Sequence, residues 1–179
     1  MPSPVGHAIG ALAAGWATAG RVERRTALRG ALILAGVGVA PDLDLLIGRH
    51  SMETHSVGAA VMVASLAAWQ RWPVASTRVR IFLTIAVAWF THPLLDAHGA
   101  DGSAPYGVMM FWPFSREHIS LVSVFDPISR RWWLPGFLTN NLLAALREVA
   151  LLGPVALLSW WVSARATRRD ARGGDQSSR

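Results

Sequence analysis

The chain contains no cysteine and no lysine, and it has few charged residues of any kind. Because cysteine is absent, disulfide bonds and thiolate ligands are excluded, and a transition-metal site would have to use histidine and carboxylate side chains. Only 16% of the 179 residues are charged, whereas 52% are hydrophobic. This balance is too apolar for an ordinary soluble domain and indicates a membrane protein.

The apolar residues gather into five runs, which cover residues 1–20, 30–47, 54–70, 81–95 and 149–164. Each approaches the roughly 20 residues that a helix needs to cross a bilayer, although 54–70 and 81–95 are short enough to be buried core helices. The first run lacks the basic start of a cleaved signal peptide, so we expect it to be retained. The sequence predicts an all-α, multi-pass transmembrane bundle of about five segments.

We expect one membrane-embedded domain over residues 1–164, with an irregular loop region on its outer side. Residues 165–179 are basic and polar, and we expect them to form a disordered cytoplasmic tail. The last apolar run has no charged residue and could begin earlier, near Thr139.

The arginines indicate how the chain crosses the membrane. All 17 basic residues are arginine, and 12 of them lie between runs one and two, between runs three and four, or after run five. By the positive-inside rule these segments are cytoplasmic, so we expect the N-terminus outside and the C-terminus in the cytoplasm. The net charge of +6 is then a topology signal, and the dispersed arginines do not predict nucleic-acid binding.

In this topology all six histidines lie toward the outer side, together with most of the acidic residues. A charged group at membrane depth costs about 2.5 to 3.5 kcal/mol on insertion scales, so such groups usually pair, line a cavity or bind ions. His98 and His118 lie in polar surroundings, and we expect them to face solvent. The remaining residues of this outer group are His7, Asp42, Asp44, His50, Glu53, His55, His92, Asp96, Asp101 and Asp126.

In or directly beside two of the apolar runs, acidic residues follow a proline. His92 and Asp96 are four residues apart, which places both on one face of a helix, and Pro93 between them should kink or restart that helix. Asp42 and Asp44 follow Pro41. They would share a face in an extended turn and point in nearly opposite directions in a regular helix, and the sequence leaves both possibilities open.

Three histidines and two carboxylates of this group have a composition suited to zinc, or to another first-row metal such as manganese. Asp44 could bind the ion directly, cap a helix or hold a histidine in one tautomer. His50, Asp44 and Glu53 are candidates for catalytic groups that move protons or orient ligands, although Glu53 could simply stabilise its turn. The predicted metal ligands are His7, Asp42, His55, His92 and Asp96.

The segment from 97 to 138 combines a loop-like composition with the aromatic clusters "MMFWPFS" and "RRWWLPGF". These clusters are typical of a belt at the membrane surface, and they could instead form a lid that selects an amphiphilic substrate. Arg147 lies beside Glu148, where it could form a local ion pair or contact a substrate phosphate.

The stretches "GHAIG", "APDLD", "RHSMETHS", "THPLLD" and "YGVMMFWPFS" resemble the bacterial membrane-bound metal-dependent hydrolase family, some members of which are LexA-regulated. The resemblance covers residues 1 to about 135, and the order of its histidines and aspartates is distantly similar to that of zinc-dependent phospholipase C. It implies that the five residues above bind metal. His50 matches the first histidine of the family's turn, but Ser51 stands where that turn usually has arginine.

The spacing of the ionisable groups predicts a site at the outer face of the bacterial inner membrane, and the resemblance implies that the protein is a metal-dependent hydrolase. The resemblance implies a phosphoester or lipid-like substrate, small and amphiphilic. The alternative is a non-catalytic metal-binding membrane protein, such as a cation carrier or a scaffold. A carrier needs ionisable groups along a path, whereas the inner halves of the apolar runs contain almost none, which favours a site at the surface.

Overall fold

The computed structural model describes residues 1–20, 24–48, 50–100, 106–129 and 131–176. Five α-helices and two short 3₁₀ helices follow one another in the order α1 (Pro4–Ala19), α2 (Arg24–Val39), η1 (Ala40–Ile47), η2 (Glu53–His55), α3 (Val57–Gln70), α4 (Arg78–Ala97) and α5 (Phe137–Gln176). The described residues contain no β-strand and only two isolated bridges. The predicted all-α bundle is therefore confirmed.

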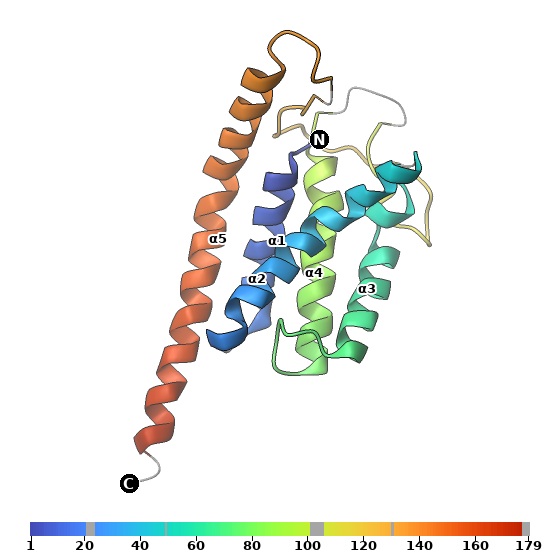
Figure 1. Ribbon diagram of the computed structural model, residues 1–179. Helices are drawn as coiled ribbons and strands as arrows, with labels where there is room; N and C mark the ends of the chain where they lie inside the picture. The colour runs from blue at the N-terminus through green and yellow to red at the C-terminus, as the bar shows by residue number, and fades with distance from the viewer. Residues whose placement is uncertain (21–23, 49, 101–105, 130, 177–179) are drawn as a thin grey trace.

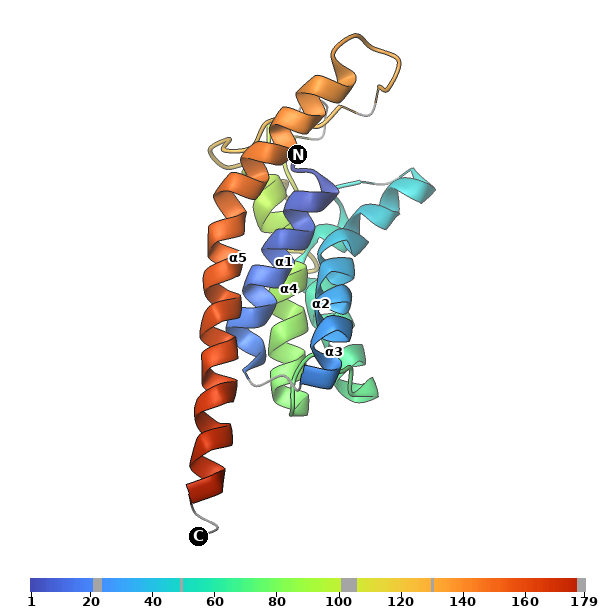
Figure 2. The same ribbon diagram turned by 60° about the vertical axis from the view of Figure 1, so that its left-hand side comes forward.

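The helices run alternately in opposite directions, and α5 lies along α1 in both views (Figures 1 and 2). The start of α1, both 3₁₀ helices, the end of α4 and residues 106–129 and 131–136 lie at one end, which we call the histidine end. The starts of α2 and α4 and the ends of α1 and α3 lie at the other, which we call the arginine end (Figure 1). The described histidines thus lie together at the histidine end, as the apolar runs predict, and Arg71, Arg78 and Arg80 lie at the arginine end, while Arg116 and Arg131 lie at the histidine end.

Three helical segments are long and apolar enough to cross a membrane. They are Thr26–Ile47, Arg78–Ala97 and Phe137–Arg165, with mean hydropathies of 1.8, 1.3 and 1.7. The runs 1–20 and 54–70 form the shorter helices α1 and α3, of 16 and 14 residues. α5 is helical through Gln176, while residues 177–179 lie outside the described part. The disorder expected for 165–179 stays a prediction.

Side-chain caps fix where the helices that carry the site begin. Ser3 caps α1, because its hydroxyl accepts a hydrogen bond from the Gly6 backbone N–H at 3.2 Å. Ser56 caps α3 in the same way, accepting from the Ala59 N–H at 3.1 Å. Because Ser3 fixes where α1 begins, it also fixes the position of His7 one turn into that helix. Ser56, which fixes where α3 begins, directly follows His55 in the sequence.

Small side chains allow the helices around the site to approach closely. The buried core is rich in alanine, and Gly38 lies where α2 crosses α1. A Cβ atom at Gly38 would lie 2.5 Å from the His7 carbonyl oxygen and 2.5 Å from the Ala11 side chain. The crossing therefore requires glycine at this position.

One buried carboxylate holds α5 against α1. Glu148 is 1% exposed and accepts hydrogen bonds from the Ser3 backbone N–H, at 2.7 Å, and from the Ser3 hydroxyl. The amino end of α1 favours a negative charge at this place. The local pair between Arg147 and Glu148 that the sequence allowed is not formed, because Arg147 donates instead to both carboxylate oxygens of Asp126, at 2.9 and 3.0 Å.

Candidate metal centre

Helix α4 supplies two members of the site from one face. His92 and Asp96 are both buried, and His92 Nε2 lies 3.2 Å from Asp96 Oδ2. This is the arrangement that their spacing of four residues predicts. The helix does not restart at Pro93, as the sequence allowed, but continues through it to Ala97.

Two more histidines meet this pair from other elements. His7, from the second turn of α1, places Nε2 3.3 Å from Asp96 Oδ1 and stacks its ring on that of His92, with the ring centroids 3.7 Å apart. His55, from η2, places Nε2 3.1 Å from His92 Nε2 and 3.4 Å from Asp96 Oδ2. All four side chains are 0% exposed.

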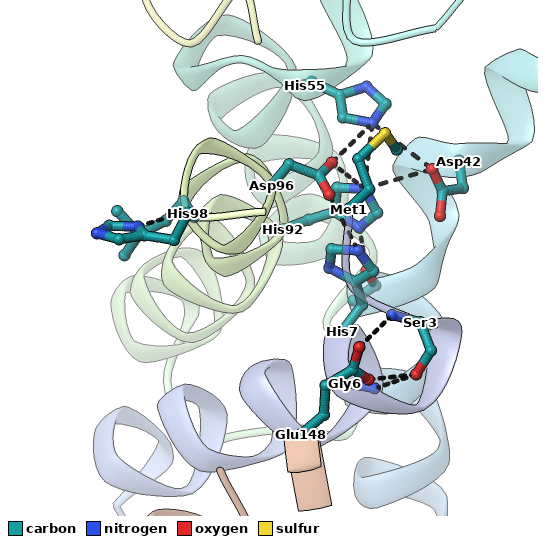
Figure 3. Close-up of polar contacts among 12 residues, drawn as sticks. Met1, Ser3, Gly6, His7, Asp42, His55, His92, Asp96, His98 and Glu148 are labelled. Carbon is teal, nitrogen blue, oxygen red and sulfur yellow. Dashed lines mark hydrogen bonds and ion pairs between the residues drawn. The ribbon is translucent and has the colours of Figure 1, made fainter. Parts of the chain in front are cut away.

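Asp42 and Asp44 take different positions because they lie in a 3₁₀ helix, which has three residues per turn. Asp42 Oδ1 lies 3.6 Å from His92 Nε2 and 3.7 Å from His55 Nε2. Asp44 lies behind His55, with Oδ2 3.3 Å from His55 Nδ1. Asp42 thus faces the centre, and Asp44 contacts a histidine from outside it. We call His7, Asp42, His55, His92 and Asp96 the His/Asp cluster (Figure 3).

Hydrogen bonds fix the tautomers of two of the histidines. His92 Nδ1 lies 2.6 Å from the Gly38 carbonyl oxygen, which can only accept, so Nδ1 carries the proton. The Thr54 hydroxyl donates to Asp44 Oδ2 at 2.6 Å and therefore accepts from His55 Nδ1, which is 3.0 Å away. In both rings the lone pair is then on Nε2. Because these two Nε2 atoms are 3.1 Å apart, a proton or a metal cation must lie between them.

The remaining donor atoms also suit a metal ion. Neither oxygen of Asp96, nor Oδ1 of Asp42, nor either ring nitrogen of His7 has a hydrogen-bond partner among the described residues. The separations between neighbouring donor atoms are 3.1 to 3.7 Å. Metal–ligand bonds of 2.0 to 2.1 Å around a tetrahedral zinc ion give donor separations of about 3.3 Å. These buried groups could therefore hold a metal ion.

Among the described residues, the side chains of the cluster and its neighbour His50 are exposed at one edge. The side chain of Asp42 is 18% exposed and that of His50 is 21% exposed, while those of His7, His55, His92 and Asp96 are fully buried. His50 Nδ1 lies 3.4 Å from Asp44 Oδ1 and 3.7 Å from Asp42 Oδ1. Burial lowers the pKa of His50 below its ordinary value, as does the neighbouring His55, while Asp44 and Asp42 oppose this shift.

Other residues that the sequence singled out lie apart from the cluster. His98 points away from it and hydrogen-bonds to the Leu94 carbonyl (Figure 3). Glu53 begins η2 and belongs to none of the described groups that could hold an ion. Arg147 and Asp126 are about half exposed and pair with each other. Asp101 lies outside the described residues.

Several contacts that support the cluster were not predicted from the sequence. Thr54 links Asp44 to His55, and the Trp89 indole donates to the Thr54 carbonyl at 2.9 Å. Gly38 supplies the acceptor for His92, and Met1 Sδ lies 3.0 Å from His50 Nε2. Thr54 stands beside His55 in the RHSMETHS stretch and could have been suspected, whereas a backbone carbonyl leaves no signal in a sequence.

No curated protein and no solved structure matches the chain. The sequence model of one family, described as YdjM inner membrane protein, matches residues 1–170 and so includes every member of the His/Asp cluster. Because this match covers nearly the whole chain, the protein belongs to the YdjM inner membrane protein family.

Proposed function

We propose that the protein is a metal-dependent hydrolase of the bacterial inner membrane, with the His/Asp cluster as its metal site. The observation that carries this proposal is the 3.1 Å approach of His55 Nε2 to His92 Nε2, with both lone pairs facing the carboxylates of Asp42, which is 18% exposed, and Asp96, which is buried. Two imidazoles and two carboxylates at such separations form a coordination shell that needs a cation to be stable.

The donor set fits zinc best among the common metals. Imidazole and carboxylate ligands suit zinc and also manganese, and no thiolate is available to favour softer ions. A divalent cation bound here would act as a Lewis acid, polarising the bond under attack and lowering the pKa of a water molecule toward about 7. We therefore propose zinc as the cofactor and keep manganese as the second candidate.

The residues around the open edge would carry the rest of the chemistry. His50 lies there beside Asp42, and its lowered pKa keeps the ring neutral near pH 7, so that it can accept a proton from a water molecule. Asp44 contacts both His50 and His55 and would orient the two rings. We assign proton transfer to His50, an orienting role to Asp44, and no direct role to Glu53.

The surroundings of the open edge favour a substrate with an apolar part. Leu43, Leu46 and Ile47, from the same 3₁₀ helix as Asp42, are 61 to 83% exposed. An amphiphile could place its chain against these side chains and its polar group against Asp42 and His50. A phosphoester of a lipid-like molecule has this chemistry, and we propose it as the substrate class.

The alternative of a cation carrier is less well supported. A carrier needs polar groups from one end of the bundle to the other. The segments that continue from the cluster toward the arginine end are 8–19, 30–39, 57–69 and 81–91, and they contain no acidic residue, histidine or arginine. A metal-stabilised scaffold remains as the rival to an enzyme.

Metal analysis of the detergent-purified full chain tests the proposed site. We expect the wild type to retain zinc or manganese, and His92→Ala and Asp96→Ala to lose about tenfold or more of the metal affinity. His98→Ala is the matched control, because His98 lies on the same stretch of chain and points away from the cluster. Equally negligible metal in the wild type and all variants would remove the hydrolase hypothesis.

An activity assay then separates an enzyme from a scaffold. Hydrolysis of a chromogenic phosphodiester should appear with added zinc or manganese, and should be lost in His50→Ala while the metal content of that variant stays high. Metal binding without hydrolysis of any phosphoester or lipid ester offered in detergent would favour the scaffold.

A further inference from the structure

The two carboxylate oxygens of Asp96 face different nitrogen atoms. Oδ2 lies 3.2 Å from His92 Nε2 and 3.4 Å from His55 Nε2, whereas Oδ1 lies 3.3 Å from His7 Nε2. Neither oxygen has a hydrogen-bond donor among the described residues, although the side chain is completely buried. A carboxylate placed in this way can bind one cation through each oxygen.

One tetrahedral ion does not use all the donors of the cluster. His55, His92 and Asp96 Oδ2 form one group of donor atoms within 4.8 Å of one another, and Asp42 Oδ1, which lies 3.7 and 3.6 Å from the two Nε2 atoms, can supply the fourth ligand that such an ion takes. His7 is left over and fully buried, and neither of its ring nitrogens has a hydrogen-bond partner in the part of the chain that the structure describes. A buried imidazole without a hydrogen bond is costly, and its Nε2 lies 3.3 Å from Asp96 Oδ1, the oxygen that the first ion does not use.

Because His7 stacks on His92, the two rings direct their nitrogen lone pairs at different points and so can bind cations at different positions. Their planes differ by only 15° and their centroids are 3.7 Å apart. Because the lone pair of an imidazole nitrogen lies in the plane of its ring, two stacked rings direct their lone pairs along nearly parallel planes. They therefore aim at different points, and the distance between the rings is close to the 3.5 to 4 Å that typically separates the ions of two-metal sites.

We propose that the cluster holds two divalent cations that share the carboxylates of Asp96 and Asp42. The first position is formed by His55, His92, Asp42 and Asp96 Oδ2. The second is formed by His7 and Asp96 Oδ1 with Asp42, whose carboxylate lies within 4.8 Å of the ligand atoms of His7 and His92. This proposal rests on the metal site proposed above and deepens it.

The two positions differ in the number of protein ligands. The first has four, which is the pattern of a closed site, whereas the second has three and leaves room for a ligand from outside the chain. Paired cations that share a carboxylate are suited to an anionic group such as a phosphoester, because they bind two of its oxygens. The second ion should also bind more weakly and exchange more readily than the first.

The stoichiometry of bound metal tests this inference. The full chain in detergent is loaded with zinc, freed from excess metal by gel filtration, and analysed for zinc and protein. We expect two zinc ions per chain in the wild type, one in His7→Ala and two in the His98→Ala control. His7 lies outside the first position, so that the variant should keep the ion bound by His55 and His92.

The possible failures are distinguishable. One zinc ion per chain in both the wild type and His7→Ala would overturn the second position and leave the proposed metal site intact. Absence of bound zinc from the wild type would end the proposed function itself.

A spectroscopic measurement on the wild type covers the case in which His7→Ala does not fold. Two Mn²⁺ ions that share a carboxylate are magnetically coupled and give a broad, coupled electron paramagnetic resonance spectrum. We expect this spectrum from the fully loaded wild type. The simple spectrum of an isolated Mn²⁺ ion at full loading would overturn the proposal, whatever the behaviour of the variant.

Discussion

At the scale of single residues, Thr54 connects the cluster to its support. Its hydroxyl donates to Asp44 Oδ2 and accepts from His55 Nδ1, and so fixes the tautomer that leaves the His55 lone pair facing Asp42 and Asp96. We expect Thr54→Val, which keeps the shape and removes the hydroxyl, to weaken metal binding about 10- to 100-fold. Competition with a chelating dye in detergent would measure the change.

Thr54→Ser is the matched control, because it restores the hydroxyl and removes only a methyl group. It should bind metal as the wild type does. An unchanged affinity in Thr54→Val would mean that Asp44 alone orients His55 and that the Thr54 hydroxyl has no part in metal binding.

The residues of the cluster could be chosen from the sequence, but their individual positions could not. The spacing of His92 and Asp96 was enough to place both on one face of α4. The choice between Asp42 and Asp44 depended on the 3₁₀ geometry of η1, which has no signature in the pattern of apolar residues. The contact between Glu148 and Ser3 joins positions 145 residues apart and follows only from the packing of α5 on α1.

At the scale of elements, the crossing of α2 and α1 at Gly38 affects the positions of two cluster residues, His7 and His92. Gly38→Ala would place a Cβ atom 2.5 Å from the His7 carbonyl oxygen and would push α2 away from α1. Since the Gly38 carbonyl also holds His92 Nδ1, we expect a loss of stability of roughly 1 to 3 kcal/mol, together with weaker metal binding. Thermal unfolding in detergent and the zinc content would report the two effects.

Gly36→Ala provides the control within the same helix. A Cβ atom at Gly36 would meet nothing within 4 Å, so that alanine should be neutral or should stabilise α2 by up to about 1 kcal/mol. Equal stability of both variants would show that the crossing can widen without cost.

The apolar runs predicted the position of every α-helix that the structure describes, but not the residues at which the helices begin and end. The run 81–95 becomes the 20-residue helix α4 because Thr77 caps it and Arg78 and Arg80 lie in its first turn. The run 149–164 lies within the much longer α5, which begins at Phe137. Charged residues near a helix end do not interrupt the helix, but they do end a run of apolar residues. The runs 81–95 and 149–164 are therefore shorter than the helices that contain them.

At the scale of the whole molecule, the orientation in the membrane is the main prediction. The starts of α2 and α4 and the end of α3, beside which Arg71, Arg78 and Arg80 lie, are at the end of the bundle opposite the His/Asp cluster, and the positive-inside rule predicts that this end is cytoplasmic. Fusions of green fluorescent protein and of alkaline phosphatase after residue 25 and at the C-terminus should both report the cytoplasm. Phosphatase activity at either site would reverse or break the predicted topology.

The membrane character could be predicted from physical signals in the sequence, whereas the bacterial membrane protein family came from the resemblance of short motifs. Apolar runs and the distribution of arginine indicated a helical membrane protein, and the family match confirms a bacterial inner membrane family for residues 1–170. Hydrolysis remains a proposal. The reaction depends on the metal and on the positions of the groups near His50. Differences of a few tenths of an ångström in these positions matter, and a hydropathy pattern does not contain them.

The donors of the cluster come from α1, η1, η2 and α4, which leave the ribosome at different times. Asp96 is the last of them to be synthesised, so insertion into the membrane and completion of the centre are separate events. If the cluster is a metal site, as we propose, Asp42 and Asp96 would hold negative charge where the helices must close until a cation binds, and this charge would oppose the final packing of the bundle. Metal supply would then decide how much of the inserted protein matures, and starvation for metal would leave an open form that membrane proteases can degrade.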